Sequence, residues 1–430
     1  MRLSKFNIIL DKTDGTYIYN TLTSSVLKLT DEYKQNFSEF YNSQNSDVLF
    51  KDLTDNLRLG KMIVNDDLDE ISYIKNIHYM HKYSNAASSY TIAPTLECNF
   101  RCPYCYEKGK NYTTMDEGTI DNLTKMIEEN SNISKYLSIC WYGGEPLLAF
   151  DIIEKLSLVA IDKFNNYFEA SMVTNGYLLS KDIVEKLEKL HIKTIQITID
   201  GPPEIHNKRR RLPNGGDTFF KILENIQNAI KINNKLNISI RINVDKNNIN
   251  ESYEILEYFE KYNLKDKVAF YTAPVDNINN TYTNSSCFTN KEYAKEQISF
   301  LRYALDKGFI CINLPLANPS ICGAVSSNNF VIGPKGELYK CWDDIGYESE
   351  ELGNIGDNGY ELLENNNYCK WINYSPFDSE CEECIFLPSC MGGCPNKRVK
   401  EQSKGCITIK ENYTDMINLL IQQKELLTHY

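Results

Sequence analysis

The feature that most limits the fold of this chain is a regular alternation of strand-like and helix-like segments between residues 89 and 310. Six apolar, β-rich runs recur there: Tyr90–Leu96, Leu137–Tyr142, Ala170–Thr174, Thr194–Ile199, Ile238–Val244 and Val268–Ala273. Amphipathic helical stretches lie between them, among them Ile152–Phe164, Lys181–Leu190 and Thr218–Ile232. Strands that alternate with helices indicate βαβ units and a parallel sheet. The sequence therefore predicts an α/β fold, an open partial (β/α)6 barrel.

Residues with special chemistry follow the first four predicted strands. Cys98 follows the first, Gly143-Gly144-Glu145-Pro146 the second, Thr174-Asn175-Gly176 the third and Asp200-Gly201 the fourth. Ligands and catalytic groups of parallel sheets and barrels lie at the carboxyl ends of the strands. We therefore expect these residues to converge on one mouth of the barrel.

The segments on either side of the alternation have a different composition. Residues 1–88 contain strand-like runs at Asn7–Leu10 and Thr16–Tyr19 and a helix-like run at Ser24–Tyr33, which predicts a small α+β domain. Residues 311–430 are rich in Gly, Asn, Cys and acidic residues and close with a helix-like run, Tyr413–Leu427. Such a segment has little apolar content for a core and would need metal ions to hold it together. The predicted domains are 1–88, 89–310 and 311–430.

Cysteine is unusually abundant in this chain. The 430 residues include 14 Cys but only five His. The N-terminus carries no signal-peptide pattern and no run is long enough to span a membrane, so we expect a cytoplasmic protein with no membrane partner. Cytosolic thiols stay reduced, and these cysteines are therefore predicted to be metal ligands or catalytic thiols. The formal net charge of −12 argues against a nucleic-acid partner.

Three cysteines form a tight motif, Cys98-x3-Cys102-x2-Cys105, with Tyr104 before the last of them. A usual iron–sulfur cluster takes four thiolates, so three would leave one iron of a [4Fe–4S] cluster open for a small molecule. A zinc knuckle that borrows a fourth ligand is the alternative. The motif resembles that of the radical S-adenosylmethionine (SAM) superfamily. The resemblance implies that SAM chelates the open iron and is cleaved reductively to a 5′-deoxyadenosyl radical, which abstracts hydrogen from a substrate.

Other segments resemble the SAM-binding residues of the same superfamily. Gly143-Gly144-Glu145-Pro146 resembles the GGEP segment, whose backbone and carboxylate would hold the SAM ammonium group. Thr198-Ile199-Asp200-Gly201-Pro202 resembles the Ser-Leu-Asp-Gly segment of the superfamily, which implies that the Thr198 hydroxyl lies near SAM. Arg210 lies where the superfamily has an arginine that pairs with the SAM carboxylate. Asn175 and Arg241 are candidates for ribose or SAM contacts, and Tyr104 is a further cofactor-binding candidate. The neighbours of Arg210, namely Lys208, Arg209 and Arg211, are expected to form a solvated charged loop.

The C-terminal cysteines resemble the SPASM domain, the cysteine-rich extension of radical SAM enzymes that modify peptides. Their order is Cys322, Cys341, Cys381, Cys384, Cys390, Cys394 and Cys406. By resemblance, Cys381, Cys384, Cys390 and Cys406 hold a distal auxiliary cluster, and Cys322, Cys341 and Cys394 hold a nearer one, which makes three [4Fe–4S] clusters in the chain. The fourth ligand of the nearer cluster could be Cys311 or Cys287, or its iron could be open. Cys140 and Cys369 are expected to be ordinary buried or half-buried thiols, and a zinc-only array is the alternative.

Three functions are compatible with these patterns. The first is a peptide maturase that forms a crosslink in a ribosomally made precursor peptide. The favoured crosslink is a thioether from a cysteine thiol to carbon, and a carbon–carbon or ether crosslink is the alternative with the same parts. A reductant such as flavodoxin or ferredoxin and the leader of the peptide would be its partners. Residues 1–88 resemble the winged-helix-like peptide-recognition element of such maturases, which implies that the leader binds there as an added strand, with Thr16–Tyr19 as the candidate edge. The alternative is that this region only braces the barrel.

The second function is that of a sulfatase-maturating, formylglycine-forming enzyme. That family carries a base directly after the cysteine that corresponds to Cys341, where this chain has Trp342. The third is a non-catalytic iron–sulfur or zinc scaffold.

Overall fold

A computed structural model of the chain describes residues 1–430 except 14, 44, 111, 316–321, 357–358 and 429–430. The packing of the backbone divides the chain into two compact units. One unit, called here the barrel unit, comprises Ser84–Cys311 and Ser327–Ile372. The other, the terminal unit, comprises Met1–Tyr83, Ile312–Ser326 and Asn373–Tyr430. Both units thus draw on segments that are distant in the sequence.

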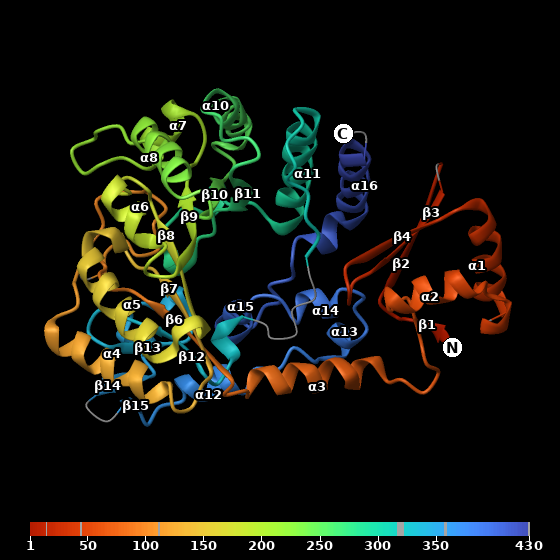
Figure 1. The fold of residues 1–430 in the computed structure, drawn as a ribbon, viewed down its shortest axis with the longest axis horizontal. Helices are drawn as coiled ribbons and strands as arrows, with labels where there is room; N and C mark the ends of the chain where they lie inside the picture. Colours follow the sequence, from red (N-terminus) through yellow and green to blue (C-terminus); the bar gives the residue numbers. More distant parts are fainter. Residues whose placement is uncertain (14, 44, 111, 316–321, 357–358, 429–430) are drawn as a thin grey trace. The chain divides into compact units, whose positions relative to one another are not determined.

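The core of the barrel unit is a parallel sheet that contains all six predicted strands (Figure 1). They are β6 (Ala87–Ile92), β7 (Tyr136–Trp141), β8 (Phe168–Thr174), β9 (Ile192–Thr198), β10 (Asn237–Val244) and β11 (Ala269–Pro274). Each pairs in parallel with the next in chain order. The partial (β/α)6 barrel predicted from the sequence is confirmed.

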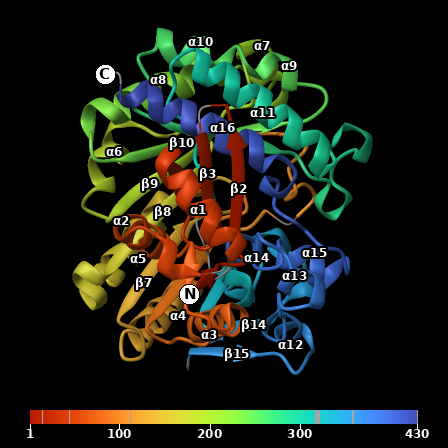
Figure 2. The same cartoon turned by 90° about the vertical axis from the view of Figure 1, so that its right-hand side faces the viewer.

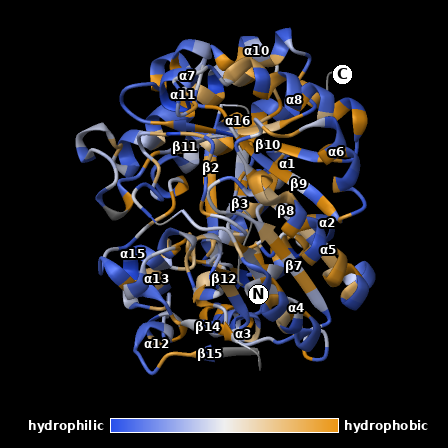
Figure 3. Cartoon of the chain, turned by 90° about the vertical axis from the view of Figure 1, so that its left-hand side faces the viewer, coloured by the Kyte–Doolittle hydropathy of each residue, from blue (hydrophilic) through white to orange (hydrophobic). Residues whose placement is uncertain are grey.

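The helices that connect these strands cover the outer side of the sheet (Figure 1). They are α4 (Glu117–Asn130), α5 (Phe150–Phe164), α6 (Lys181–Leu187), α7 (Pro203–Arg209), α8 (Phe219–Ile232), α9 (Ile249–Ser252), α10 (Ile255–Lys261) and α11 (Asn290–Asp306). Side chains such as Asp116 and Ser180 cap the first backbone N–H groups of α4 and α6, which otherwise lack partners. Helix α8 buries Phe219, Ile222 and Ile226. Figure 3 shows hydrophobic residues gathered along β7, β8 and β9, where these helices pack.

The sheet continues beyond the six barrel strands. Strand β12 (Asn329–Ile332) pairs in parallel with β6, and β13 (Glu337–Tyr339), β14 (Gly353–Gly356) and β15 (Gly359–Leu362) follow as antiparallel neighbours. Helix α12 (Asn367–Ile372) ends this segment. The sequence patterns predict no strand after residue 310, because runs of three or four residues are too short to show a period.

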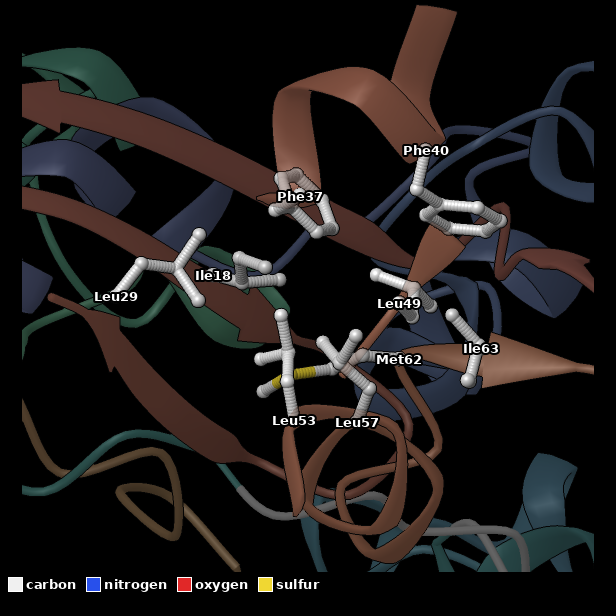
Figure 4. Packing of buried hydrophobic residues seen from close by; sticks show 9 residues of the cluster. All are labelled: Ile18, Leu29, Phe37, Phe40, Leu49, Leu53, Leu57, Met62 and Ile63. Atoms are coloured by element: carbon white, nitrogen blue, oxygen red, sulfur yellow. The ribbon is translucent and has the colours of Figure 1, made fainter. Parts of the chain in front are cut away.

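The terminal unit begins with a three-stranded antiparallel sheet of β2 (Asn7–Lys12), β3 (Gly15–Asn20) and β4 (Ser25–Leu29). Strand β1 (Arg2–Leu3) pairs with β5 (Ile63–Val64), and three helices follow the sheet: α1 (Asp31–Ser43), α2 (Lys51–Leu59) and α3 (Glu70–Lys82). Figure 4 shows the apolar core of this region, in which side chains of α1 and α2 meet those of β3 and β4. The small α+β region expected at the N-terminus is therefore present.

Two expectations about this region were wrong. The predicted helix at Ser24–Tyr33 is strand β4 followed by the start of α1, because Val26 and Leu27 pair with Tyr19 and Ile18 of β3 and Leu29 is buried. The segment Thr16–Tyr19 is not an edge, because β3 pairs on one side with β2, its neighbour in Figure 2, and on the other side with β4. The strands with an unpaired side in this sheet are β2 and β4.

The part of the terminal unit after residue 373 contains short helices, two of which carry a cysteine, Cys381 in the first and Cys390 in the second. These are α13 (Ser379–Glu382), α14 (Leu387–Cys390) and α15 (Pro395–Lys400), and α16 (Ile409–Thr428) confirms the predicted final helix. Leu387 and Met391 pack against Phe6 and Ile74, so the two ends of the chain share one small core. Within the described ranges, no helix is both long and apolar enough to cross a membrane.

Candidate active site

The carboxyl ends of the barrel strands surround a cavity of about 330 Å³. The three motif cysteines line it, together with residues from the ends of β7, β8, β9, β10 and β11. Of the predicted SAM contacts, the following seven line this cavity: Tyr104, Gly143, Gly144, Asn175, Thr198, Arg210 and Arg241. The convergence expected from the strand-end rule is therefore present.

Two glycines let the turn after β7 lie directly against the backbone that leads into the cysteine loop. The Gly144 N–H donates to Thr95 O at 3.1 Å, and the Glu145 N–H donates to Glu97 O at 2.8 Å. A Cβ atom at Gly144 would lie 2.3 Å from Glu97 O, and one at Gly143 would lie 2.4 Å from Thr95 O. Gly143 also has a φ of +109°, which side chains disfavour. Glycine is therefore required at positions 143 and 144, because the turn packs directly against the backbone that precedes Cys98.

Glu145 is the one predicted SAM contact that does not line the cavity. Its carboxylate is fully buried and accepts hydrogen bonds from Thr174 Oγ1 at 2.7 Å and from the Asn175 N–H at 2.7 Å. It also accepts from the Leu147 N–H at 3.0 Å. Burial raises the pKa of this carboxyl, and the hydrogen bonds partly offset that effect. Glu145 thus ties the end of β7 to the end of β8, and Asn175 extends the link to Asn99 of the cysteine loop at 2.7 Å.

Tyr104 connects the cysteine loop to the ends of β9 and β10. Its hydroxyl donates to Asp200 Oδ2 at 2.5 Å and accepts from Arg210 Nη1 at 2.9 Å and from Asn243 Nδ2 at 3.3 Å. Burial raises the pKa of this phenol, so it stays protonated. The Nε atom of Arg210 is buried and has no partner within the protein, while the side chain lines the cavity. A buried cation with an unused donor suits an anionic group of a ligand.

Arg209 corrects the expectation of a solvated charged loop around Arg210. Its guanidinium is buried and donates to Asp200 Oδ2 at 3.0 Å and to Asp245 Oδ2 at 2.7 Å. Lys208 and Arg211 are exposed, as expected. Arg209 is the last residue of α7 and Arg210 follows it. The side chain of Arg209 meets the two carboxylates, whereas that of Arg210 lines the cavity.

His206 links the backbone of Asp200 to Thr218, which in turn contacts the backbone of Arg210. Its Nδ1 accepts the Asp200 N–H at 3.3 Å, and its Nε2 lies 3.1 Å from Thr218 Oγ1. The Thr218 hydroxyl already donates to Arg210 O at 2.7 Å, so Nε2 carries the ring hydrogen and donates to Thr218. Burial, and then the charges of Arg210 and Arg209, lower the pKa of this imidazole well below its usual value.

Aromatic and acidic side chains form another side of the cavity. The ring of Trp342 stacks on that of Tyr142 with centroids 5.5 Å apart and an interplanar angle of 15°. The Tyr106 hydroxyl lies 2.9 Å from the Tyr142 hydroxyl and 3.2 Å from Glu107 Oε1. Burial raises the pKa of Glu107 to about 7. Asp343 also lines the cavity, next to Cys341, whose Sγ lies 3.7 Å from Asp343 Oδ2.

Sequence reasoning missed Asn243, Asp245, Gln196 and this aromatic wall. Asn243 and Asp245 lie at the end of β10, so the strand-end rule would have found them had it been applied to the fifth strand. Gln196 lies inside β9 and faces the cavity, a position that the sequence does not distinguish. Trp342 comes from a separate segment, and its stacking depends on the tertiary fold alone.

In the terminal unit, four cysteines line one small hollow of about 30 Å³. They are Cys381, Cys384, Cys390 and Cys406, the set predicted for the distal auxiliary cluster. The backbone between them turns sharply, with Met391, Gly392 and Gly393 all at positive φ. A Cβ atom at Gly393 would lie 2.0 Å from Gly405 O, so this glycine allows the segment before Cys394 to meet the segment before Cys406.

The remaining cysteines divide between the two units. Cys341, Cys311 and Cys287 belong to the barrel unit, whereas Cys322 and Cys394 belong to the terminal unit. The ligand set of the nearer auxiliary cluster, and its fourth ligand, therefore stay predictions. Cys140 is half-buried on β7, as expected. Cys369 is exposed on α12, so the expectation of a buried thiol was wrong for it.

The comparison with protein families identifies the chemistry of the barrel. Residues 92–259 match the model of the radical SAM superfamily. That range holds the three cysteines and all the predicted SAM contacts. The protein is a radical SAM enzyme. The alternative of a non-catalytic scaffold was therefore wrong.

Relatives of this radical SAM enzyme include proteins with different reactions. A cysteine-type anaerobic sulfatase-maturating enzyme of Clostridium perfringens is 26% identical over 350 residues, which cover 74% of this chain and 90% of that protein. The radical SAM cyclopropyl synthase TigE of Paramaledivibacter caminithermalis is 24% identical over 445 aligned positions, which cover 94% of this chain and 88% of that protein. The crystal structure of Streptococcus suis SuiB bound to its precursor peptide SuiA superposes with a TM-score of 0.55 and 14% identity, over 95% of this chain and 98% of that one.

The residues of the cavity fit a cluster and SAM. The cavity holds the three thiols of Cys98, Cys102 and Cys105, which would bind iron as thiolates with loss of their protons. Arg210 offers its unused donor, and two side-chain-free glycines border the space. In the described parts of the chain, no three His, Cys, Asp or Glu converge on one metal ion. In a [4Fe–4S] cluster each cysteine binds a different iron, so three thiols fit a cluster with one open iron.

Proposed function

We propose that this radical SAM enzyme modifies a ribosomally made precursor peptide and installs a thioether crosslink between a cysteine thiol and a carbon atom. The observation that carries the assignment to peptide modification is the extent of the likeness, while the thioether is the bond expected from the sequence patterns. TigE and SuiB correspond to 94% and 95% of this chain, whereas the sulfatase-maturating relative corresponds to 74%. SuiB is solved with a precursor peptide, and the terminal unit here provides a sheet whose outer strands, β2 and β4, each have an unpaired side to which an extended leader can add.

The cofactors proposed are three [4Fe–4S] clusters and SAM. Cys98, Cys102 and Cys105 hold the catalytic cluster, and Gly143, Gly144, Thr198, Asn175, Arg210 and Arg241 surround SAM. When bound, cluster and SAM together supply a 5′-deoxyadenosyl radical for hydrogen abstraction. Tyr104 and Asp200 position Arg210 for the SAM carboxylate, and Glu145 holds the two strand ends at the correct separation.

The proposed reaction balances without a further oxidant. One C–H and one S–H bond of the peptide are lost and one C–S bond forms, while SAM becomes methionine and 5′-deoxyadenosine and one proton is released. SAM is thus the two-electron oxidant. Closure of the C–S bond would release one electron, which balances the one supplied by reduced flavodoxin or ferredoxin, and an auxiliary cluster held by the C-terminal cysteines would accept it.

Formylglycine formation is the second candidate, and one observation favours it. Asp343 lines the cavity one residue beyond Trp342, so a carboxylate does reach the space where a substrate would lie. Trp342 itself occupies the position of the base in that family, and it is stacked on Tyr142. An indole cannot accept a proton at neutral pH, which is why we place this candidate second.

The test is a reaction with a precursor peptide encoded beside the gene. The reconstituted enzyme, SAM and dithionite are incubated with the peptide, and the product is analysed by mass spectrometry and thiol alkylation. A thioether gives loss of two hydrogen atoms and one cysteine that no longer alkylates. An aldehyde that reacts with a hydrazine would instead establish formylglycine formation, and an unmodified peptide would contradict both candidates. The Cys98→Ala variant is the control.

A further inference from the structure

Arg398 holds one of the predicted cluster sulfurs in the terminal unit. Its guanidinium makes three hydrogen bonds: Nη2 donates to Cys381 Sγ at 2.9 Å, Nη1 to Asp378 Oδ2 at 2.8 Å and Nε to Gly392 O at 2.9 Å. The side chain is only 15% exposed. Because all three nitrogens of the planar guanidinium donate hydrogen bonds, the side chain has little freedom to turn away from the sulfur.

Asp378 closes a ring around the same cysteine. Its Oδ1 accepts the Cys381 N–H at 2.8 Å, while its Oδ2 accepts from Arg398. The carboxylate thus fixes both the backbone of Cys381 and the arginine that touches its sulfur.

The physical consequence concerns electron transfer. One-electron reduction of a cluster adds a negative charge that spreads onto its cysteine sulfurs. A hydrogen bond and a positive charge at one of those sulfurs stabilise the reduced state more than the oxidised state. Hydrogen bonds to the sulfurs and local charge are among the factors that set cluster potentials.

We propose that Arg398 is a positioning residue that raises the reduction potential of the distal auxiliary cluster through its hydrogen bond to Cys381. The inference rests on the proposed function only in that Cys381, Cys384, Cys390 and Cys406 hold this cluster. A higher potential makes the cluster a better acceptor for the electron released when the crosslink forms.

The experiment is an anaerobic redox titration of the reconstituted full-length protein, followed by electron paramagnetic resonance. The variant with Ala at positions 98, 102 and 105 serves to assign the auxiliary signals. Arg398→Met is expected to shift the midpoint potential of one auxiliary cluster to a more negative value. Arg398→Lys, which keeps the positive charge, is expected to restore part of the shift. Arg58→Met is the matched control, because Arg58 in the same unit donates to a sulfur that is no ligand, Met1 Sδ, at 3.0 Å.

The outcomes separate this inference from the proposed function. If Cys384→Ala does not lower the iron content, the cluster assignment fails. If Arg398→Met keeps its iron and the wild-type potential, the role of Arg398 fails. If Arg398→Met loses the cluster, the midpoint potentials of Arg398→Lys and Asp378→Asn test the role of Arg398 instead. Both variants are expected to show smaller negative shifts, and wild-type potentials in both would overturn the inference.

Discussion

Arg209 and Asp200 form an ion pair beneath the active-site cavity, with Nε and Oδ2 3.0 Å apart and the Asp200 side chain fully buried. Asp245 completes the arrangement at 2.7 Å from Arg209 Nη1, and the Tyr282 hydroxyl donates to the same Oδ2 at 2.8 Å. Asp200 in turn accepts the hydroxyl of Tyr104, which lies between two of the motif cysteines. The pair therefore connects the ends of β9 and β10 to the cysteine loop.

Replacing Arg209 by methionine should destabilise the protein strongly. The change leaves Asp200 and Asp245 buried without their cation, and removal of one partner of a buried pair costs about 3–5 kcal/mol. Denaturant unfolding measures the effect. The exposed neighbour gives the control, since Lys208→Met is expected to change stability by less than about 0.5 kcal/mol. Equal stability of the two variants would show that the buried pair contributes nothing.

Gly144→Ala should disrupt the turn after β7. The added Cβ would lie 2.3 Å from Glu97 O and 2.6 Å from Leu96 O, so the backbone before Cys98 must move. Overpacking of this kind costs about 1–3 kcal/mol, and we expect loss of SAM binding with it. Gly118→Ala in α4 is the control, because its nearest neighbour would be 3.6 Å away. Equilibrium dialysis with SAM compares the two, and normal binding by Gly144→Ala would contradict this account of the turn.

The stability of the protein should fall as pH drops below about 6.5, the usual pKa of histidine. His206 has a lowered pKa, so below this pH the unfolded chain binds a proton that the folded protein does not. Protons then favour unfolding, while above this range His206 is neutral in both states and contributes no pH dependence. Unfolding free energies of wild type and His206→Gln, measured from pH 8 to 5.5, test this. The variant should show a shallower loss, and identical slopes would contradict the prediction.

Cys384→Ala should separate SAM cleavage from product formation. Cys384 lines the hollow of the terminal unit and not the barrel cavity. We expect iron to be lost and the modified peptide to be absent, while 5′-deoxyadenosine still forms to some extent. Iron analysis and chromatography of the two products measure this. Full product formation by the variant would show that the distal cluster is dispensable.

The barrel could be predicted from the sequence because its signals are local. Six apolar runs of ordinary strand length alternate with helices, and each special residue follows its own strand. The strand β4 was mistaken for a helix because its pattern is five residues long, and its strand character comes from pairing with β3. Strands β12 to β15 were missed for a similar reason.

The details of the site depended on tertiary contacts that no motif records. Arg209 and Arg210 are adjacent, and nothing in the sequence shows that one meets Asp245 and the other the cavity. Glu145 belongs to a segment that resembles the SAM-binding GGEP motif, yet its carboxylate accepts hydrogen bonds from Thr174 and Asn175. Arg398 contacts Cys381 across 17 residues, a distance over which no periodicity operates.

The most direct test of the account is a combined count of iron and assay of SAM cleavage. The protein is purified without oxygen and reconstituted, iron and sulfide are counted per chain, and 5′-deoxyadenosine is measured after SAM and dithionite are added. The account predicts about twelve irons, as three [4Fe–4S] clusters require. It also predicts 5′-deoxyadenosine from the wild type and none from the variant with Ala at positions 98, 102 and 105. Zinc without iron, or 5′-deoxyadenosine from that variant, would contradict it.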